Sequence, residues 1–287
     1  MKPRGAPRGD RPGALPEPQG AILDPTAAAR AFRIVRVRPA APLADHVRHY
    51  WFLSWDLRGR PPHDQSTVGH PGVNVVIEAA VDGVYGVPVR RFDRRLEGQG
   101  SVFGTLFHPA GFHGFFQASV HTLTGRSVPT RSVFSGDVDA LRTGLFGLDP
   151  DHDDDGASRG ALLDAFFLRD LPPPDPRVAA LNAVMATAAA DRTLVRAEQL
   201  AERVGIGLRT LQRQLRRYVG VGPKWVLRRY RLHDAAERLA AGDDVDQAAL
   251  AFALGYYDQA HFVRDFTALI GQSPGRYAAR GARRPTG

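Results

Sequence analysis

The chain contains no cysteine among its 287 residues. Disulfide bonds, thiolate metal sites and cysteine nucleophiles are therefore excluded, and such a composition suits a reducing cytoplasm. No apolar run approaches the roughly 18 residues that a membrane span needs, so we expect no membrane partner. Residues 1–26 are rich in proline and basic side chains and lack the apolar stretch of a secretory signal, so we expect a disordered tail there.

Acidic residues are scarce in the C-terminal part of the chain. Residues 1–174 hold 20 Lys and Arg against 19 Asp and Glu, whereas residues 175–287 hold 18 against 11. Between Arg203 and His233 there are nine Lys and Arg and no acidic residue. Such a one-sided charge attracts a polyanion, most commonly nucleic acid. The alternative is a solvated surface helix.

Long helical patterns are missing from residues 27–148, where short β-branched and aromatic runs alternate with glycine, proline and aspartate. This spacing is typical of a β-rich sandwich or small barrel. The runs expected to form strands are 32–39, 49–57, 73–80, 101–112 and 114–120. Residues 149–174 are expected to form a linker, with an acidic loop, a short apolar helix over 161–171 and a proline run.

The pattern from Asp175 to residue 281 is helical throughout. Asp175 is an acidic N-cap before a proline at the first helical position. The further helices that we expect cover 196–204, 208–219, 223–241, 246–254, 258–270 and 274–280. Residues 282–287 would form a short tail. The predicted fold class is therefore multidomain α+β, with a β-rich N-terminal domain and an all-α C-terminal domain.

A short pattern is written twice in the helical part, as LQRQLRRYVGVGP from Leu211 and as FVRDFTALIGQSP from Phe262. Each copy follows a shorter helix and a glycine turn, which predicts two helix-turn-helix motifs. The side chains expected to pack inward before the turns are Leu200, Ala201 and Val204 in the first motif and Val245, Ala249, Phe252 and Leu254 in the second. The long helix between the motifs would hold the two reading helices about one DNA turn, ~34 Å, apart.

The outward faces of the two reading helices carry the residue types that base recognition requires. Arginine can bond guanine O6 and N7 in the major groove, glutamine can bond adenine N6 and N7, and a small residue suits a thymine methyl group. The predicted base contacts are Arg209, Gln212 and Arg213 in the first helix and Gln259, Ala260, His261 and Arg264 in the second.

The two motifs resemble the DNA-binding domain of the AraC/XylS transcription regulators. The resemblance covers about a hundred residues and includes the second-motif signature Gly-aromatic-x-Asp-x-x-x-Phe-x-Arg-x-Phe followed by Gly-x-Ser-Pro-x-x-Tyr. This signature falls on Gly255, Tyr256, Asp258, Phe262, Arg264, Phe266, Gly271, Ser273, Pro274 and Tyr277. Gly207 and Gly222 stand where the family usually has serine. Thr267 stands where it usually has lysine, so the second motif is expected to bind DNA more weakly.

Phosphate contacts are expected around the base-reading positions. They would supply affinity without sequence preference. The candidates are Arg216, Arg217, Lys224, Arg228 and Thr267. The resemblance implies a cytoplasmic, sequence-specific regulator of promoter DNA, with RNA polymerase and a second copy of the chain as further candidate partners.

In the same family an N-terminal β-domain, often cupin-like, commonly binds an effector or mediates dimerisation, which fits the strand-rich residues 27–148. YWFLSWDL, HPGVNVVIE and LFHPAGFHGFF also resemble a group of such regulators with a divergent sensor domain. An aromatic-lined effector pocket is one reading of this domain and ordinary core packing is the other. Its candidate residues are Trp51, Trp55, His70, Asn74 and Glu78, with Tyr85, Phe103 and Phe107 as further lining.

We expect no enzyme activity, cofactor or metal in this half. Metal cupins need two histidines one residue apart, and no His-x-His occurs. Residues 151–156 imitate the start of an EF-hand loop, but its twelfth position is Leu162 instead of glutamate. Two alternatives stay open. One is a cupin-like enzyme with an accessory DNA-binding module, and the other is an architectural protein that binds any duplex.

Overall fold

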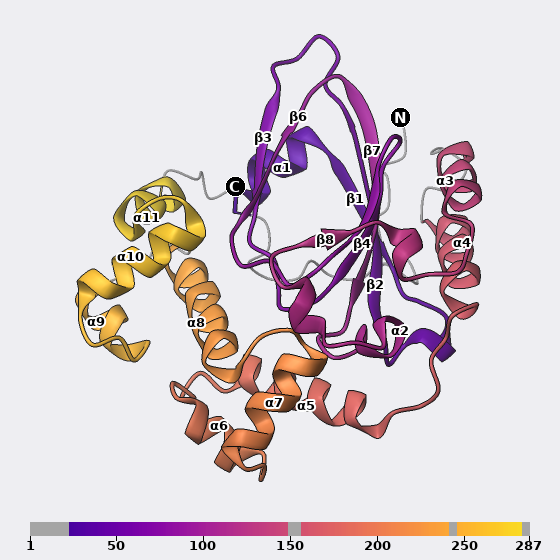
Figure 1. Ribbon diagram of the computed structural model, residues 1–287. Helices are drawn as coiled ribbons and strands as arrows, with labels where there is room; N and C mark the ends of the chain where they lie inside the picture. The colour runs from indigo at the N-terminus through magenta and orange to yellow at the C-terminus, as the bar shows by residue number, and fades with distance from the viewer. Residues whose placement is uncertain (1–22, 149–155, 241–245, 283–287) are drawn as a thin grey trace, which may run out of the picture.

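The computed structural model describes residues 23–148, 156–240 and 246–282 and divides them into a β-rich and a helical domain (Figure 1). The N-terminal domain holds a six-stranded sheet in the order β1-β2-β7-β4-β5-β8 and a separate ladder of β3 and β6, with every pairing antiparallel. The strands are β1 (Arg33–Val37), β2 (Val47–Asp56), β3 (His63–Thr67), β4 (Asn74–Ile77), β5 (Asp82–Tyr85), β6 (Phe92–Leu96), β7 (Gln99–Phe107) and β8 (Ser127–Val128). The predicted β-rich domain is confirmed, and its likeness to a cupin stays a prediction.

Strand β2 is the centre of the large sheet because it pairs along its length with β7, from Val47 opposite Phe107 to Asp56 opposite Gln99. Side chains alternate between the two faces of a strand. Tyr50 therefore points into the main core, where it is fully buried, while Trp51 points to the opposite face.

The run 114–120, expected to be a strand, is helical instead. It forms most of α2 (His113–Phe116) and the start of the 3-10 helix η2 (Val120–Leu123), joined through Gln117 in the left-handed region at φ 55°. Phe112 and Phe115 are three apart and both enter the core, a spacing that suits a helix and not a strand. The neighbouring expected strand, 101–112, ends as β7 at Phe107, shortly before Pro109.

The helix predicted inside the linker belongs to the N-terminal domain. It is α4 (Ala157–Leu168), and it packs beside α3 (Val138–Gly147) with Phe166 and Phe167 in the same core as β2 (Figure 1). Tyr50 donates a 2.7 Å hydrogen bond to Asp164 of this helix. The β-rich domain therefore extends to about residue 171, past its expected end at 148. The acidic residues 149–155 lie outside the described part of the chain.

The described chain is also ordered earlier than expected. Helix α1 (Pro25–Ala31) begins within the predicted tail, because the Asp24 carboxylate caps it by accepting from Ala27 N at 3.1 Å. Residues 1–22 and 283–287, which include most of the two predicted tails, lie outside the described residues.

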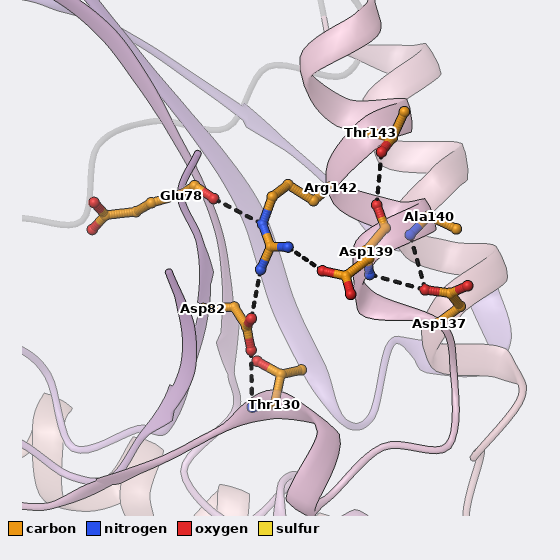
Figure 2. A network of polar contacts seen from close by, with 8 residues as sticks. All are labelled: Glu78, Asp82, Thr130, Asp137, Asp139, Ala140, Arg142 and Thr143. Carbon is orange, nitrogen blue, oxygen red and sulfur yellow. Dashed lines mark hydrogen bonds and ion pairs between the residues drawn. The ribbon is translucent and has the colours of Figure 1, made fainter. Parts of the chain in front are cut away.

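Arg142 joins α3 to the β4–β5 hairpin (Figure 2). Its guanidinium donates to Asp82 Oδ2 at 2.6 Å and to the Glu78 carbonyl at 3.1 Å, and it also pairs with Asp139 one turn earlier. The second Asp82 oxygen accepts from Thr130 N at 3.0 Å. Arg142 and Asp82 are each about one-fifth exposed, so this pair is only partly screened by solvent.

Replacing Arg142 by alanine should lower the free energy of unfolding by about 1–3 kcal/mol, because it leaves Asp82 half-buried without its cation. Urea denaturation of the full chain measures the change. Arg95→Ala is the matched control, since Arg95 is 59% exposed and pairs with Asp64 at 3.4 Å. Exposed pairs contribute about 0–1 kcal/mol. Equal losses in both variants would contradict a stabilising role for the Arg142 network.

The C-terminal domain contains α5 (Pro176–Ala190), α6 (Ala197–Arg203), α7 (Leu208–Tyr218), α8 (Pro223–Ala240), α9 (Gln247–Ala253), α10 (Gln259–Ile270) and α11 (Pro274–Ala282). These positions agree with the predicted helices to within two residues at nearly every end. Helix α8 is unbroken over 18 residues, about 27 Å at 1.5 Å per residue. None of the helices in the described ranges is long and apolar enough to cross a membrane.

Part of the predicted inward face of α9 is wrong. Phe252 is 82% exposed and Ala249 is also exposed, whereas Leu250, Ala251 and Leu254 are buried. Successive residues of a helix are about 100° apart, so Phe252 stands nearly opposite Leu250. The fourth residue expected on that face, Val245, lies outside the described residues.

Candidate nucleic-acid interface

The first helix-turn-helix motif consists of α6, a turn at Gly205 and α7. Gly205 has a φ of 67°, in the left-handed region that glycine adopts without strain. Leu211 and Leu215 of α7 are fully buried against α6 and α5, which fixes the rotation of α7. The polar side chains on its other face are all exposed: Arg209, Gln212, Arg213, Arg216 and Arg217.

These five side chains line a hollow of about 550 Å³ whose remaining wall is Ser119 of the N-terminal domain. Four of them are guanidinium groups, and within the described residues none of the four pairs with a carboxylate. Unpaired guanidiniums on one helix face can receive phosphate oxygens or guanine edges. The first motif therefore presents a cationic reading face.

The second motif repeats the arrangement with α9, Gly255 at φ 72° and α10. Asp258 caps α10 by accepting from His261 N at 2.7 Å, and Phe262 and Phe266 are fully buried. The four predicted base contacts of this helix are exposed, namely Gln259, Ala260, His261 and Arg264. Thr267 is half-buried beside them.

Asp265 makes the second face less cationic than the first. Its carboxylate lies 3.4 Å from Arg228 Nε and 3.7 Å from His261 Nε2, and it accepts from the Tyr256 hydroxyl at 3.2 Å. Arg228, predicted to contact phosphate, is therefore already ion-paired between α8 and α10. Lys224 is exposed at the start of α8. Arg217 donates from Nε to His113 Nε2 of the N-terminal domain at 3.3 Å.

The predicted effector residues do not come together in one pocket. Phe103 and Phe107 lie in the main core, whereas Trp51 is on the other face of the sheet, where its indole donates to Asn74 Oδ1 at 3.2 Å. Trp55 donates to the Glu97 carbonyl at the far end of the strand pair. The reason is strand alternation, which sends Trp51 and Phe103 to opposite faces although β2 and β7 are neighbours.

The polar candidates are also separated. Glu78 accepts two hydrogen bonds from Arg94, at 2.8 and 2.7 Å, while Tyr85 is 39% exposed. The His70 ring stacks on His233 of α8 with centroids 4.9 Å apart, at the boundary between the domains. A cavity of about 620 Å³ lies at that boundary. The sequence offered no signal for it, because it forms only where the two domains meet.

The described residues contain no group of three or more His, Cys, Asp or Glu side chains that could hold a metal ion. His46 and His113, two of the histidines weighed for metal binding, are instead buried in contacts between elements. His46 Nδ1 lies 2.8 Å from the Gly111 carbonyl, and the His113 ring stacks on Tyr218 at 3.9 Å.

Comparison with known families places both domains. Residues 35–129 match a family described as a domain of unknown function, DUF6597, and residues 200–280 match a helix-turn-helix domain. The HTH-type transcriptional activator RhaS of Pectobacterium carotovorum subsp. carotovorum (strain PC1) is 40% identical over 75 residues, 26% of each chain. RhaS of Escherichia fergusonii is 39% identical over 77 residues, 27% of each chain. The chain thus spans about a quarter of the length of these curated relatives.

Solved structures are similar over the helical domain or over most of the chain. A probable AraC family transcriptional regulator from Rhodopseudomonas palustris CGA009 is 27% identical, with 37% of this chain and 99% of that one covered and a TM-score of 0.33. The corresponding values for ToxT from Vibrio cholerae are 11%, 86%, 96% and 0.37.

Two helix-turn-helix motifs on one unbroken helix define a bipartite DNA-binding domain. Its sequence matches, together with the signature from Gly255 to Tyr277, place this C-terminal domain in the AraC/XylS family.

Proposed function

We propose that the chain is a one-component transcription regulator that binds promoter DNA sequence-specifically in the cytoplasm and is controlled through its β-rich domain. The observation that carries the proposal is the pair of exposed polar faces on α7 and α10, held by the continuous helix α8. Two such faces fit successive major-groove segments on one side of a duplex. RNA polymerase and a second copy of the chain are partners consistent with this function.

Within the interface the contacts divide by chemistry. Base reading is assigned to Arg209, Gln212, Arg213, Gln259, Ala260, His261 and Arg264. Backbone contacts are assigned to Arg216, Arg217, Lys224 and Thr267. Arg228 is withdrawn from this set, because its ion pair with Asp265 already occupies it. The unequal charge of the two faces supports a division in which the first motif supplies most of the affinity.

Control through the β-rich domain is supported by its contacts at the ends of both reading helices. After α7, the Gly220 carbonyl accepts from Thr124 Oγ1 at 2.7 Å and lies 2.8 Å from His121 Nδ1. At the end of α10, Arg91 donates to the Ile270 carbonyl at 2.7 Å. A shift of the N-terminal domain would therefore move the ends of both reading helices.

The loop between β5 and β6 connects the two motifs directly. Val87 is fully buried in the core of the first motif, and the Pro88 carbonyl accepts from Arg229 of α8 at 2.7 Å. Burial lowers the pKa of Arg229 to about 10, so the guanidinium stays charged at neutral pH. Arg91, from the same loop, reaches α10.

The test of the proposed function is selection of bound fragments from genomic DNA, followed by competition against random duplex. We expect enriched sites with two half-sites about one turn apart and a preference of about 10³-fold or more over random DNA. Equal affinity for every duplex would identify an architectural binder and overturn the proposal.

Replacing Lys224 by alanine should weaken binding to the selected site and to random DNA by the same factor. It should also reduce the slope of log K against log salt by about one unit, because one phosphate contact releases about one counterion. Fluorescence anisotropy at several salt concentrations measures both quantities. A loss confined to the selected site would assign Lys224 to base reading instead.

A further inference from the structure

The cavity of about 620 Å³ lies between the β-rich domain and the DNA-binding domain. One wall comes from β2 and from the segments after β1, β3 and β7, and the other from α5, α8 and α9. Its volume falls within the ~300–1,000 Å³ that small-molecule sites occupy. It is also separate from the hollow on α7, with which it shares no lining residue.

The wall from the β-rich domain is cationic. Its charged and titratable members are Arg38, Arg48, His49, His70 and His108, and none of its lining residues is acidic. Arg38 and Arg48 are exposed, and neither forms an ion pair with a carboxylate of the described chain. Two arginines held without counter-charge at one cavity favour a negatively charged ligand group.

The wall from the DNA-binding domain is close to neutral and partly apolar. Its acidic groups are already matched, since Asp234 pairs with Arg192 and, at 2.9 Å, with Arg238, while Asp191 pairs with Arg203. Glu237 lies 3.9 Å from Arg192. The apolar and aromatic surface beside them comes from Ala188, Ala189, Leu194, Leu227, Tyr230, Ala253 and Leu254.

The histidines of the cationic wall are uncharged at neutral pH. Burial, followed by Arg36 and Arg48, lowers the pKa of His49 to about 3. Burial and Arg48 also lower the pKa of His108, against the opposing effect of Asp45. A neutral imidazole can still donate one hydrogen bond, so it can join the arginines in holding an acid group without adding repulsion.

We propose that this cavity binds a small organic anion, with the acid group at Arg38 and Arg48 and a compact apolar body against Leu194, Leu227 and Leu254. The proposal rests on the proposed function, because this anion is the effector that the regulator would sense. Both domains line the cavity, so an occupant contacts the sensor on one side and α8, which carries both motifs, on the other. Binding therefore changes the relative stability of docked and undocked domains.

The experiment uses the full chain and a matched pair of fluorescent probes. Anilinonaphthalene sulfonate carries an aromatic body with a negative charge, and N-phenylnaphthylamine carries the same body without it. We expect saturable binding of one sulfonate probe per chain and binding of the neutral probe at least about tenfold weaker, as the loss of one charge-assisted bond predicts. Hydrogen exchange should then slow in both walls, at β2 and at α8.

Variants separate the cavity from general surface binding. Arg48→Ala should weaken the sulfonate probe about tenfold, Arg48→Lys should restore most of the affinity, and the exposed control Arg95→Ala should leave it unchanged. Equal binding of the two probes, or unchanged affinity in Arg48→Ala, would overturn the anion site. DNA binding of the same samples is measured in parallel. Normal DNA binding with no probe effect removes this site alone, whereas loss of sequence preference removes the regulator itself.

Discussion

Alanine at position 213 should weaken binding to the selected DNA site by about 1–3 kcal/mol and relax the preference at one base pair. Arg213 lies in the middle of the exposed face of α7, and among the described residues no carboxylate holds its guanidinium. An arginine in this position can bond both acceptors of a guanine, and alanine removes that discrimination. Competition binding with a site variant at each base pair measures the effect.

The comparison variant is Lys224→Ala, which should lower affinity for all of these duplexes alike. Arg213→Ala should instead show nearly the same affinity for the original base pair and its substitutes at one position only. If Arg213→Ala lowers binding to selected and random DNA by one common factor, the residue contacts the backbone and its assignment to base reading is wrong.

Phe167→Ala should lower the stability of the β-rich domain by about 3–5 kcal/mol. Phe167 is fully buried in α4, and its ring centroid lies 5.1 Å from that of Phe134 and 5.5 Å from that of Phe107. Truncation would open a cavity among aromatic rings that come from several different elements. Hydrogen exchange of the β2 amides, together with urea denaturation, reports the loss in this domain.

The control lies next to it on the same helix. Leu168 is 38% exposed, so Leu168→Ala should cost less than about 1 kcal/mol. The outcome that would contradict the structure is a small effect of both substitutions. It would mean that α4 is a detached linker helix, as the sequence first predicts.

The helical domain was predictable because its signals are local. Glycine turns, an acidic cap at Asp175 and 3.6-residue periodicity mark each helix, and the exposed faces of α7 and α10 follow from the burial of Leu211 and Phe262. Phe252 shows the limit of this reasoning. A stripe assigned one position out of phase on a seven-residue helix puts an aromatic side chain on the wrong side.

The β-rich domain was less predictable because its order depends on distant partners. Strands β3 and β6 have the sequences HDQST and FDRRL, which are too polar to stand out, and they pair only with each other. The aromatic run around Phe115 has the composition of a strand but the spacing of a helix. The cavity between the domains could not be predicted at all, since its two walls are more than a hundred residues apart in the chain.

The loop from Val87 to Arg91 contacts the core of the first motif, the spacer helix and the end of α10. In the proposed regulator, the angle between the two reading helices is therefore a property of the whole chain. A change in the length of this loop would alter which separation of half-sites the protein accepts, without touching a single base-contacting residue. Operator choice could then diverge between relatives through their β-rich domains while the recognition residues stay the same.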